Sequence, residues 1–391
     1  MHRSVWMASP GAGVALLASV LGALGAPGPA AMTDAKGAKM TVYIGTYTGE
    51  KSKGIYRADF DAATGELGAP VLVAETPSPS FLAIDPKRRF LYAVNETGPV
   101  GSVCAYAVDP ATGGLTPLNR QSSEGAYPCH VSVDATGRTV MVANYGNGIV
   151  ASYPVQPDGS LGPAASVIRH DGSGPNKARQ EGPHAHSIYP DPGNRRALAA
   201  DLGADRIYLY DLNPEAGKIE PTAPAFASIA PGSGPRHIAF GKDGKHAYVI
   251  NEMLSTITVC AYDDATGVLT PGQTVPTLPE GFGGASTTAE IAVHPSGRFV
   301  YGSNRGHDSL AIFSANARTG RLTLVGFQPT GGKNPRSFAI DPTGAYLLAA
   351  NQDSDSIVVF RIDSKTGKLT PTGRKASVGL PVCLVFAPGR Q

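Results

Sequence analysis

The sequence has almost no net charge, few cysteines and, beyond its first 31 residues, no apolar run approaching the ~20 residues that span a membrane. Its 33 lysines and arginines nearly balance 31 aspartates and glutamates, and the basic residues are scattered. Nucleic-acid binding requires a concentrated basic surface, so no nucleic-acid partner is expected. Neither the density of a disulfide scaffold nor the spacing of a zinc site is present, and packed free thiols are predicted for the four cysteines, Cys104, Cys129, Cys260 and Cys383.

The single apolar run lies at the N-terminus. His2 and Arg3 precede a small-residue apolar stretch from Gly11 to Ala26, and small residues up to Ala31 suit cleavage. The stretch is too short and too rich in glycine for a membrane span. Residues 1–31 are therefore predicted to be a signal peptide, the mature chain to be periplasmic or secreted, and membrane contact to end with cleavage. An uncleaved anchor or a disordered tail is the alternative.

What the chain has in abundance is glycine and proline, 48 and 33 residues, together about a fifth of its 391 residues. Such a composition suits many short strands joined by turns. Aligned with itself, the chain repeats one phrase: an alternating apolar strand, a turn such as Asp-Pro or Asp-Gly, and a second strand ending in Asn or Asp. Six complete copies begin at Pro79, Pro128, His184, Pro235, Thr288 and Pro335.

A seventh copy is divided between the two ends of the chain. Its first half is PVCLVFAP from Pro381, and its second half is TVYIGTYT from Thr41. The copies start 46 to 56 residues apart, which suits one four-stranded blade and exceeds a leucine-rich or helical repeat. A second series of glycine turns gives the same count of seven, at Gly65, Gly113, Gly159, Gly217, Gly267, Gly320 and Gly367.

No single unit can bury both its faces, so the units must stack, and the divided copy closes the ring and removes free sheet edges. The sequence therefore predicts an all-β fold over residues 40–391, a seven-bladed β-propeller of four antiparallel strands per blade, with both chain ends in one blade. A pair of β-sandwiches is the alternative, but it leaves the divided copy unexplained. We expect a monomer.

The start of the first strand and the end of the second strand lie on one rim of an antiparallel blade. If the first strand is innermost, both positions surround the mouth of the central channel. The third positions of the phrases are Phe81, His130, His186, His237, Glu290, Ser337 and Cys383. The second strands end in Asn95-Glu96, Asn144-Tyr145, Asp201, Asn251-Glu252, Asn304-Arg305, Asn351-Gln352 and Thr46-Tyr47.

Histidines, arginines and carboxylates from separate blades thus converge on one rim. Ester or lactone hydrolysis needs a base for water, a cation for the oxyanion and an acid for the alkoxide, and all three types are present. The alternative interpretation is that polar strand-end side chains hydrogen-bond between blades. No Gly-x-Ser-x-Gly phrase marks a nucleophilic serine, so water is the expected nucleophile.

A metal ion is not expected. His184 and His186 alternate along a strand, and with Asp201 they could bind one. Spacing fixes no third ligand, however, and neighbouring arginines disfavour a cation. No cofactor is predicted either.

The longest departure from the repeat is the Gly- and Pro-containing segment from His170 to Gly182. Its tip carries Lys177 and Arg179, which could cover the mouth and contact an anionic substrate. A plain surface insertion is the alternative.

These phrases resemble the propeller-type 6-phosphogluconolactonases and the related fungal carboxy-muconate cyclases. The resemblance extends from about Val42 to Phe386 and is carried by GPHAHS at Gly182, ADLGADRI at Ala200, GPRHIAF at Gly234, VINE at Val249, AEIAVHPSGRFVYGSNRG at Ala289 and PRSFAIDPTG at Pro335. It implies a seven-bladed propeller, lactone hydrolysis or its reverse, and no obligatory metal. By motif, the implied catalytic residues are His184 or His186, Arg236, Glu252 and Arg305, with Glu290 beside them.

The sequence therefore predicts a hydrolase that opens a small sugar or sugar-phosphate lactone. His184 or His186 is the expected general base, Arg236 and Arg305 hold the carbonyl or an anionic group, and Glu252 or Glu290 orients water or acts as the acid. The expected substrate-binding residues are His130, Lys177, Arg179, Asp201, His237 and Arg336. Export argues against the cytosolic phosphogluconolactone itself. A lactonising cyclase and a non-catalytic binding propeller remain alternatives.

Overall fold

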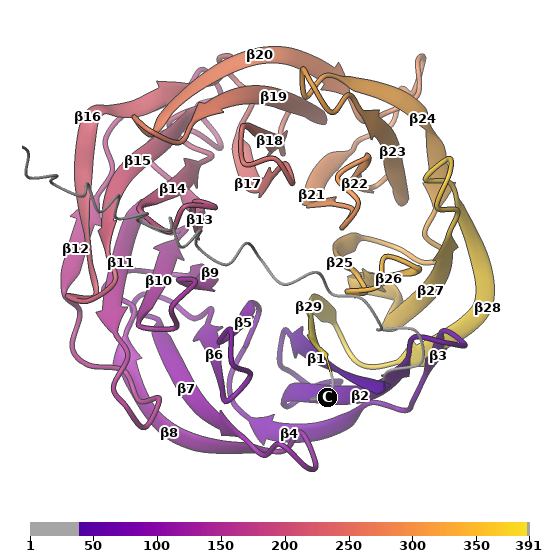
Figure 1. The fold of residues 1–391 in the computed structure, drawn as a ribbon, viewed down its shortest axis with the longest axis horizontal. Helices are drawn as coiled ribbons and strands as arrows, with labels where there is room; N and C mark the ends of the chain where they lie inside the picture. Colours follow the sequence, from indigo (N-terminus) through magenta and orange to yellow (C-terminus); the bar gives the residue numbers. More distant parts are fainter. Residues whose placement is uncertain (1–38, 389–391) are drawn as a thin grey trace, which may run out of the picture. The chain divides into compact units, whose positions relative to one another are not determined.

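The computed structural model describes residues 39–388 and shows seven antiparallel sheets arranged around a central axis (Figure 1). The predicted seven-bladed β-propeller is confirmed. The predicted signal peptide, residues 1–31, lies outside the described residues. Among residues 39–388 no helix is long and apolar enough to cross a membrane.

Six of the sheets are continuous blades of four sequential strands. The first three comprise β5 (Leu82–Ile84), β6 (Phe90–Asn95), β7 (Ser102–Val108) and β8 (Leu115–Ser122); β9 (Pro128–Val133), β10 (Thr139–Asn144), β11 (Ile149–Pro154) and β12 (Ser166–Arg169); and β13 (Ala185–Pro190), β14 (Arg196–Asp201), β15 (Arg206–Asn213) and β16 (Lys218–Ser228). The next three comprise β17 (Pro235–Phe240), β18 (His246–Asn251), β19 (Thr256–Asp263) and β20 (Val268–Pro276); β21 (Thr287–Val293), β22 (Phe299–Arg305), β23 (Ser309–Ala315) and β24 (Leu322–Pro329); and β25 (Pro335–Ile340), β26 (Tyr346–Asn351), β27 (Ser356–Ile362) and β28 (Leu369–Ser377). One 3-10 turn, η1 (Gln352–Ser354), follows β26.

The seventh blade joins the two ends of the chain, as the divided repeat predicts. β29 (Pro381–Pro388) pairs antiparallel with β1 (Lys39–Thr46), from Met40 opposite Pro388 to Thr46 opposite Pro381. Outward from β1 follow β2 (Gly54–Asp61) and an interrupted outer edge, β3 (Glu66–Leu67) and β4 (Val71–Glu75). Figure 1 shows the yellow β29 beside the indigo β1.

The first strand of every blade is innermost, since β5, β9, β13, β17, β21, β25 and β29 contact one another in succession around the axis. Between neighbouring sheets lie apolar side chains of both. For example, Val42 and Ile44 of β1 pack with Leu348 of β26. Stacking of this kind buries each sheet face that a lone blade would expose to water.

A β-bulge recurs at the mouth end of the inner strands, at the second position of the repeat phrase. Pro235 pairs with Asn251 and His237 with Ile250, so Arg236 is left unpaired between them. The same register shift leaves Cys129, His186 and Arg336 unpaired in their blades. A bulge re-aims a side chain, and here it separates second-position residues at the mouth from third-position residues deeper in the channel.

This register corrects one alignment made from the sequence. His186 occupies the second position with Arg236 and Arg336, and Ser187 is the true third-position residue. His184 lies before β13 begins, so His184 and His186 are not two alternating residues of one regular strand. The extra residues of the preceding loop concealed this shift.

The buried polar residue at or next to the end of each second strand is structural. Asn144, for example, donates from Nδ2 to the carbonyl oxygens of Ser123 and Ile149. The equivalent side chains of the other blades are also buried, namely Thr46, Asn95, Asp201, Asn251, Asn304 and Asn351. The residue after this position is the one that reaches the mouth in several blades.

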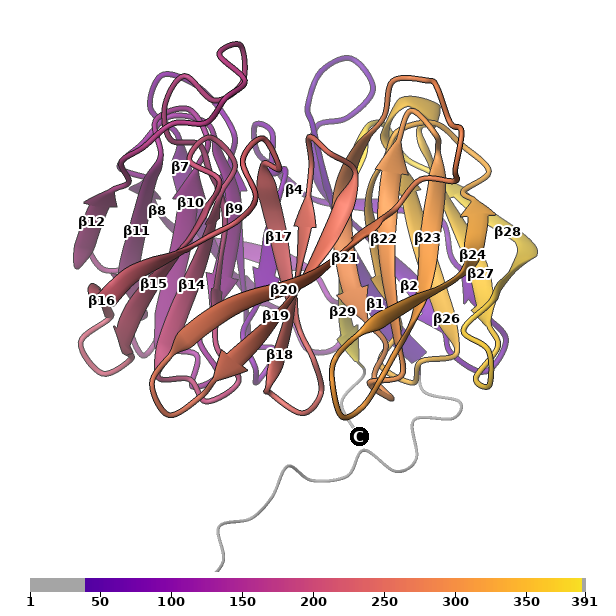
Figure 2. The ribbon, with the colours of Figure 1, turned by 90° about the horizontal axis from the view of Figure 1, so that it is seen from above.

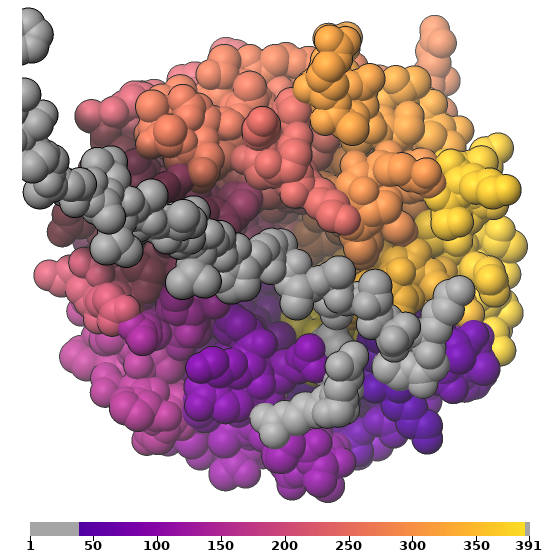
Figure 3. Space-filling model, in the orientation of Figure 1, coloured from indigo at the N-terminus to yellow at the C-terminus, as the bar shows by residue number. Residues whose placement is uncertain are grey.

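The opposite rim carries the turns between the first and second strands, such as residues 241–245 and 341–345. Figure 2 shows the C-terminal end of β29 on this lower side, with the long β12–β13 loop rising from the other edge. Figure 3 looks onto the turn-bearing side, where the blades follow one another in sequence order. Each predicted glycine hairpin is confirmed by a positive φ, from 65° at Gly320 to 90° at Gly159.

Removing β29 tests ring closure. A chain ending at Leu380 would lose Val382, Cys383 and Leu384 from the core, and would expose the edge of β1 and apolar side chains of the neighbouring blades. Each such buried side chain is worth about 2–5 kcal/mol, so the loss is comparable with the whole stability of an ordinary domain. We expect no cooperative thermal transition and elution as aggregate in gel filtration.

A chain ending at Pro388 is the control and should melt like the full-length protein. Cooperative melting of the shorter chain would show that ring closure is not required for folding.

Candidate active site

A cavity of about 380 Å³ lies at the channel mouth. Most of its lining comes from two positions of the repeat, the bulged second position of the inner strand and the end of the second strand, while Arg179 comes from the β12–β13 loop and Thr287 from the start of β21. The lining residues are Tyr47, Glu96, Cys129, Tyr145, Arg179, His186, Glu252, Thr287, Arg305 and Arg336.

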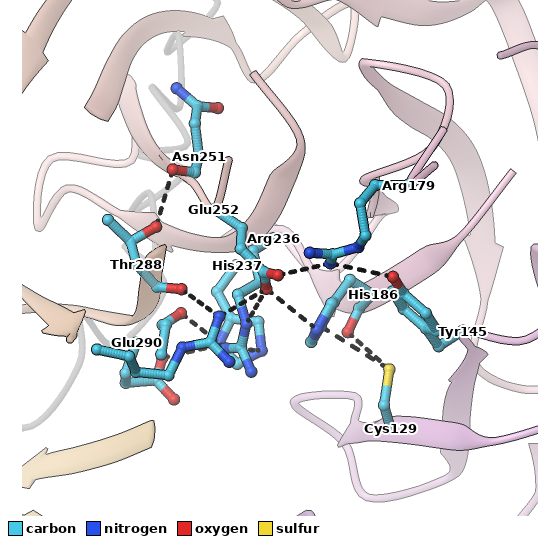
Figure 4. A network of polar contacts seen from close by, with 12 residues as sticks. Cys129, Tyr145, Arg179, His186, Arg236, His237, Asn251, Glu252, Thr288 and Glu290 are labelled. Atoms are coloured by element: carbon cyan, nitrogen blue, oxygen red, sulfur yellow. Dashed lines mark hydrogen bonds and ion pairs between the residues drawn. The ribbon is translucent and has the colours of Figure 1, made fainter. Parts of the chain in front are cut away.

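Glu252 is the centre of the site. Its Oε1 accepts a hydrogen bond from Nη2 of Arg179 at 2.7 Å. Its Oε2 lies 3.1 Å from Nε of Arg236 and 2.9 Å from Nη2 of Arg305. The three guanidinium groups come from the β12–β13 loop, β17 and β22, so one carboxylate connects three parts of the rim (Figure 4).

The charges around Glu252 fix its ionisation. Burial alone would raise the pKa of Glu252, but the three guanidinium groups outweigh burial and hold the pKa at about 2. Glu252 is therefore an anion at any physiological pH and a weak base. Burial in turn lowers the pKa of Arg305 to about 10, and it lowers the pKa of Arg236 as well.

Arg336 stands on the other side of the cavity. Its Cζ lies 5.4 Å from the centre of the Tyr47 ring, and no described residue accepts a hydrogen bond from its guanidinium group. Tyr47 donates its hydroxyl proton to Oε2 of Glu96 at 2.9 Å. This side thus presents a cation with unused donors beside a carboxylate whose Oε1 accepts no hydrogen bond from the described residues.

His186 lines the cavity between the two sides. Its Nε2 is 4.0 Å from Oε2 of Glu252, and its Nδ1 is 3.8 Å from Sγ of Cys129. Burial and the charge of Arg236 lower the pKa of His186 well below its ordinary value. The imidazole is therefore neutral near pH 7 and offers a nitrogen lone pair.

A second, deeper layer holds the third-position residues His130, His237 and Glu290. Nδ1 of His237 lies 2.9 Å from Oε1 of Glu290, and burial raises the pKa of Glu290 to about 7. The ring centres of His130 and His237 are 5.5 Å apart. Burial lowers the pKa of both histidines well below the ordinary value. None of these three residues lines the cavity at the mouth.

His184 supports Tyr145 from behind. Its Nδ1 donates to the backbone oxygen of Tyr145 at 2.7 Å, and the two rings stack with centres 4.6 Å apart. Its Nε2 lies 3.2 Å from Oε1 of Glu181. His184 therefore positions a lining residue and does not line the cavity itself.

Two other predicted substrate-binding residues also lie outside the lining. Asp201 is fully buried at the structural strand-end position, where its Oδ1 accepts from the backbone N–H groups of His184 and Ala204 and its Oδ2 lies 2.6 Å from Nδ1 of His170. Lys177 donates from Nζ to the backbone oxygen of Gly174 within its own loop.

Four lining residues were not among the predicted site residues, Tyr47, Glu96, Tyr145 and Cys129, nor was Thr287 at the start of β21. The repeat places the first three at the channel mouth, since each directly follows its second strand as Glu252 does. Among the described residues there is no group of three or more His, Cys, Asp or Glu side chains placed to hold a metal ion. All four cysteines are buried and free, as predicted.

Substitution of Glu252 by Gln tests the role of its charge. Without the carboxylate, Arg236 and Arg305 remain buried with no compensating anion, so we expect the free energy of unfolding to fall by about 3–5 kcal/mol. Urea denaturation at pH 7 measures this, with exposed Glu280 changed to Gln as the control.

Acid should have a related effect on the wild type. Because folding lowers the pKa of Glu252, its contribution is complete above its unfolded pKa near 4.5 and is lost as the pH falls toward 2. An E252Q protein as stable as the wild type, with unchanged acid sensitivity, would contradict this role.

Comparison with known proteins agrees with this geometry. Residues 41–386 match the family model described as lactonase, 7-bladed β-propeller. The chain is 40% identical over 296 residues to a protein named 6-phosphogluconolactonase from Bacillus subtilis, covering 76% of this chain and 83% of that protein.

Two solved structures are similar over nearly their whole length. One is described as a putative 6-phosphogluconolactonase from Bacteroides fragilis, with 39% identity, a TM-score of 0.85 and coverage of 91% of this chain and 99% of that one. The other is described as a periplasmic gluconolactonase from Pseudomonas aeruginosa, with 35% identity, a TM-score of 0.85 and coverage of 90% and 100%. By sequence, fold and architecture, this chain belongs to the seven-bladed β-propeller lactonase family.

Proposed function

We propose that this protein hydrolyses a small sugar-type lactone that carries an anionic substituent, with water activated by His186. The observation that carries the proposal is the joining of a neutral imidazole, a fixed carboxylate and several guanidinium groups in one cavity. Its relatives bearing the names 6-phosphogluconolactonase and gluconolactonase support the same reaction class.

The geometry favours His186 over His184 as the general base. His186 lines the cavity, whereas Nδ1 of His184 is committed to a backbone oxygen and the ring lies behind Tyr145. The low pKa of His186 makes it a weak base, but an imidazolium formed there would lie 4.0 Å from the Glu252 carboxylate. That carboxylate stabilises the charge as the proton is transferred.

Arg305 supplies positive charge for the oxyanion of the tetrahedral intermediate. Nη2 of Arg305 is held by Glu252 and by the backbone oxygen of Thr288, so its group is already oriented before substrate binds. A donor oriented in advance costs no reorganisation during the reaction.

The charge of the cavity supports an anionic substrate. Arg179, Arg305 and Arg336 line it against Glu96 and Glu252, and Arg236 adds a further positive charge behind Glu252. An excess of positive charge in a partly buried site favours a ligand that brings negative charge of its own. Arg336, whose donors have no acceptor among the described residues, is the residue best placed to bind a phosphate or carboxylate.

The compartment belongs to the same proposal. Residues 1–31 have the pattern of a signal peptide, and the similar Pseudomonas protein is described as periplasmic. We propose that the enzyme acts outside the cytoplasm, on an anionic sugar lactone present there.

A lactone panel tests the proposed function. Purified protein would be assayed with glucono-δ-lactone and its 6-phosphate by following acid release, for the wild type and for Arg336→Ala. We expect turnover of both lactones by the wild type. Loss of a charged hydrogen-bond partner should raise KM for the phosphorylated lactone about ten- to a hundredfold and change KM for the plain lactone less than about threefold.

Lys242→Ala, on the opposite rim, is the matched loss of one positive charge and should behave as the wild type. No turnover of any lactone in the panel would overturn the proposed function. Equal effects of Arg336→Ala on both lactones would remove the anion-binding role from Arg336.

The pH dependence of kcat/KM distinguishes His186 from Glu290 as the general base. His186 must be neutral to accept a proton, and its pKa is lowered, so kcat/KM should stay constant down through pH 6.5 and fall only at lower pH. If Glu290 were the base, its pKa of about 7 would place the acid limb near neutrality. A limb near pH 7 in the wild-type profile, measured by pH-stat titration, would therefore exclude His186.

A further inference from the structure

The proposed reaction has a second proton transfer, to the ring oxygen that leaves, and the role of His186 as the base does not by itself assign the donor. Opening the lactone ring breaks the bond between the acyl carbon and the ring oxygen, and that oxygen leaves as an alkoxide. An alkoxide is a poor leaving group in water, so a proton donor beside it accelerates the step, typically by 10²–10⁴-fold. Assigning that donor rests on the proposed function.

Apart from the imidazolium that forms at His186, few lining groups can give up a proton. Guanidinium groups donate hydrogen bonds but keep their protons. The Tyr47 hydroxyl already donates to Glu96, and Sγ of Cys129 lies 3.3 Å from the backbone oxygen of His186, with burial raising the pKa of its thiol. The hydroxyl of Thr287 is no more acidic than the alcohol that leaves.

Tyr145 is the remaining group, and its hydroxyl proton is free. Nη2 of Arg179 donates to the phenolic oxygen at 3.2 Å, which uses the oxygen as an acceptor only. No described residue accepts a hydrogen bond from the Tyr145 hydroxyl, and Tyr145 lines the cavity. Burial raises the pKa of Tyr145, so the phenol keeps its proton at neutral pH.

The ring of Tyr145 is held in place from several directions. Its backbone N–H donates to the carbonyl oxygen of Tyr127 at 3.0 Å, and its own carbonyl accepts from Nδ1 of His184 at 2.7 Å. The His184 ring stacks on it, and the His186 ring meets it edge-on with centres 5.6 Å apart. This support orients a reacting group, and it gives His184 a positioning role.

We propose that Tyr145 is the general acid that protonates the departing ring oxygen, with Arg179 stabilising the phenolate that results. As water attacks, its O–H bond breaks and the proton passes to Nε2 of His186. Collapse of the tetrahedral intermediate breaks the ring C–O bond, and the alkoxide oxygen takes the Tyr145 proton. The imidazolium then returns its proton to the phenolate through water, so one water is consumed and one hydroxy acid is formed.

Arg179 is placed to stabilise the phenolate because its guanidinium group contacts both the Tyr145 hydroxyl and the Glu252 carboxylate. It bridges the Tyr145 hydroxyl at 3.2 Å and Oε1 of Glu252 at 2.7 Å, and its side chain is 40% exposed. When the phenol loses its proton, the guanidinium group already lies beside the new charge.

Tyr145→Phe tests the proposal, since it removes the hydroxyl and keeps the stacked ring. With glucono-δ-lactone, whose leaving group is an alcohol, kcat should fall about a hundredfold or more while KM stays within about threefold. With dihydrocoumarin, a lactone whose leaving group is a phenol that departs without a donor, kcat should fall less than about fivefold. Thermal melting should match the wild type.

Two further variants serve as comparisons. Tyr47→Phe removes the other phenol of the cavity and should alter KM while leaving the ratio of kcat for the two lactones unchanged. Tyr127→Phe removes an exposed hydroxyl outside the lining and should have no effect. If Tyr145→Phe instead damages the site in general, kcat should fall equally for both lactones, and that result would overturn the proposal.

The measurement with glucono-δ-lactone separates failure of the Tyr145 role from failure of the proposed function. If the wild type turns over this lactone and Tyr145→Phe retains its kcat, the role of Tyr145 is refuted and the proposed function stands. If the wild type turns over none of the lactones, the proposed function fails, and this inference fails with it.

Discussion

The site depends on the charge of one buried carboxylate. Arg179, Arg236 and Arg305 approach Glu252 from a loop and two blades, and each would repel the others without it. Desolvation makes both the anion and the cations costly, so their mutual attraction has to offset that cost. The result is a group of side chains whose positions are mutually determined, and rigidity of this kind is what a preorganised oxyanion site requires.

The channel has two layers of polar side chains that differ in ionisation, and the same positive charges contribute to that difference. At the mouth, the ionised side chains of Glu252, Arg305 and Arg336 line the cavity. One residue deeper, burial and the nearby guanidinium groups lower the pKa of His130 and His237, while burial raises that of Glu290, so this layer tends toward neutrality. A recurrent β-bulge in β9, β13, β17 and β25 contributes to the division, because it turns successive residues of these inner strands toward different levels.

The sequence predicted the fold almost completely and the site in part. Stacked repeats and the divided copy constrain the ring strongly, and the glycine turns fix the hairpins. The strand register at the channel mouth was harder to predict from the sequence. Asp201 occupies the structural position of Asn144 and Asn251, but a carboxylate there looks like a ligand-binding residue in sequence. His186 was aligned one position too deep, since nothing in the sequence marks a bulge. Arg179 lies in a loop, and only tertiary contacts with Glu252 bring it to the cavity.

Tyr47 and Tyr145 show why residue type alone does not assign a role. Both directly follow a second strand, and both present a phenol to the cavity. The hydroxyl of Tyr47 faces the Glu96 carboxylate, whose Oε2 accepts a hydrogen bond from it. The hydroxyl of Tyr145 faces the Arg179 guanidinium group, which can only donate, so its proton is left for another acceptor. The sign of the neighbouring charge thus makes one phenol a structural donor and leaves the other able to act on a substrate.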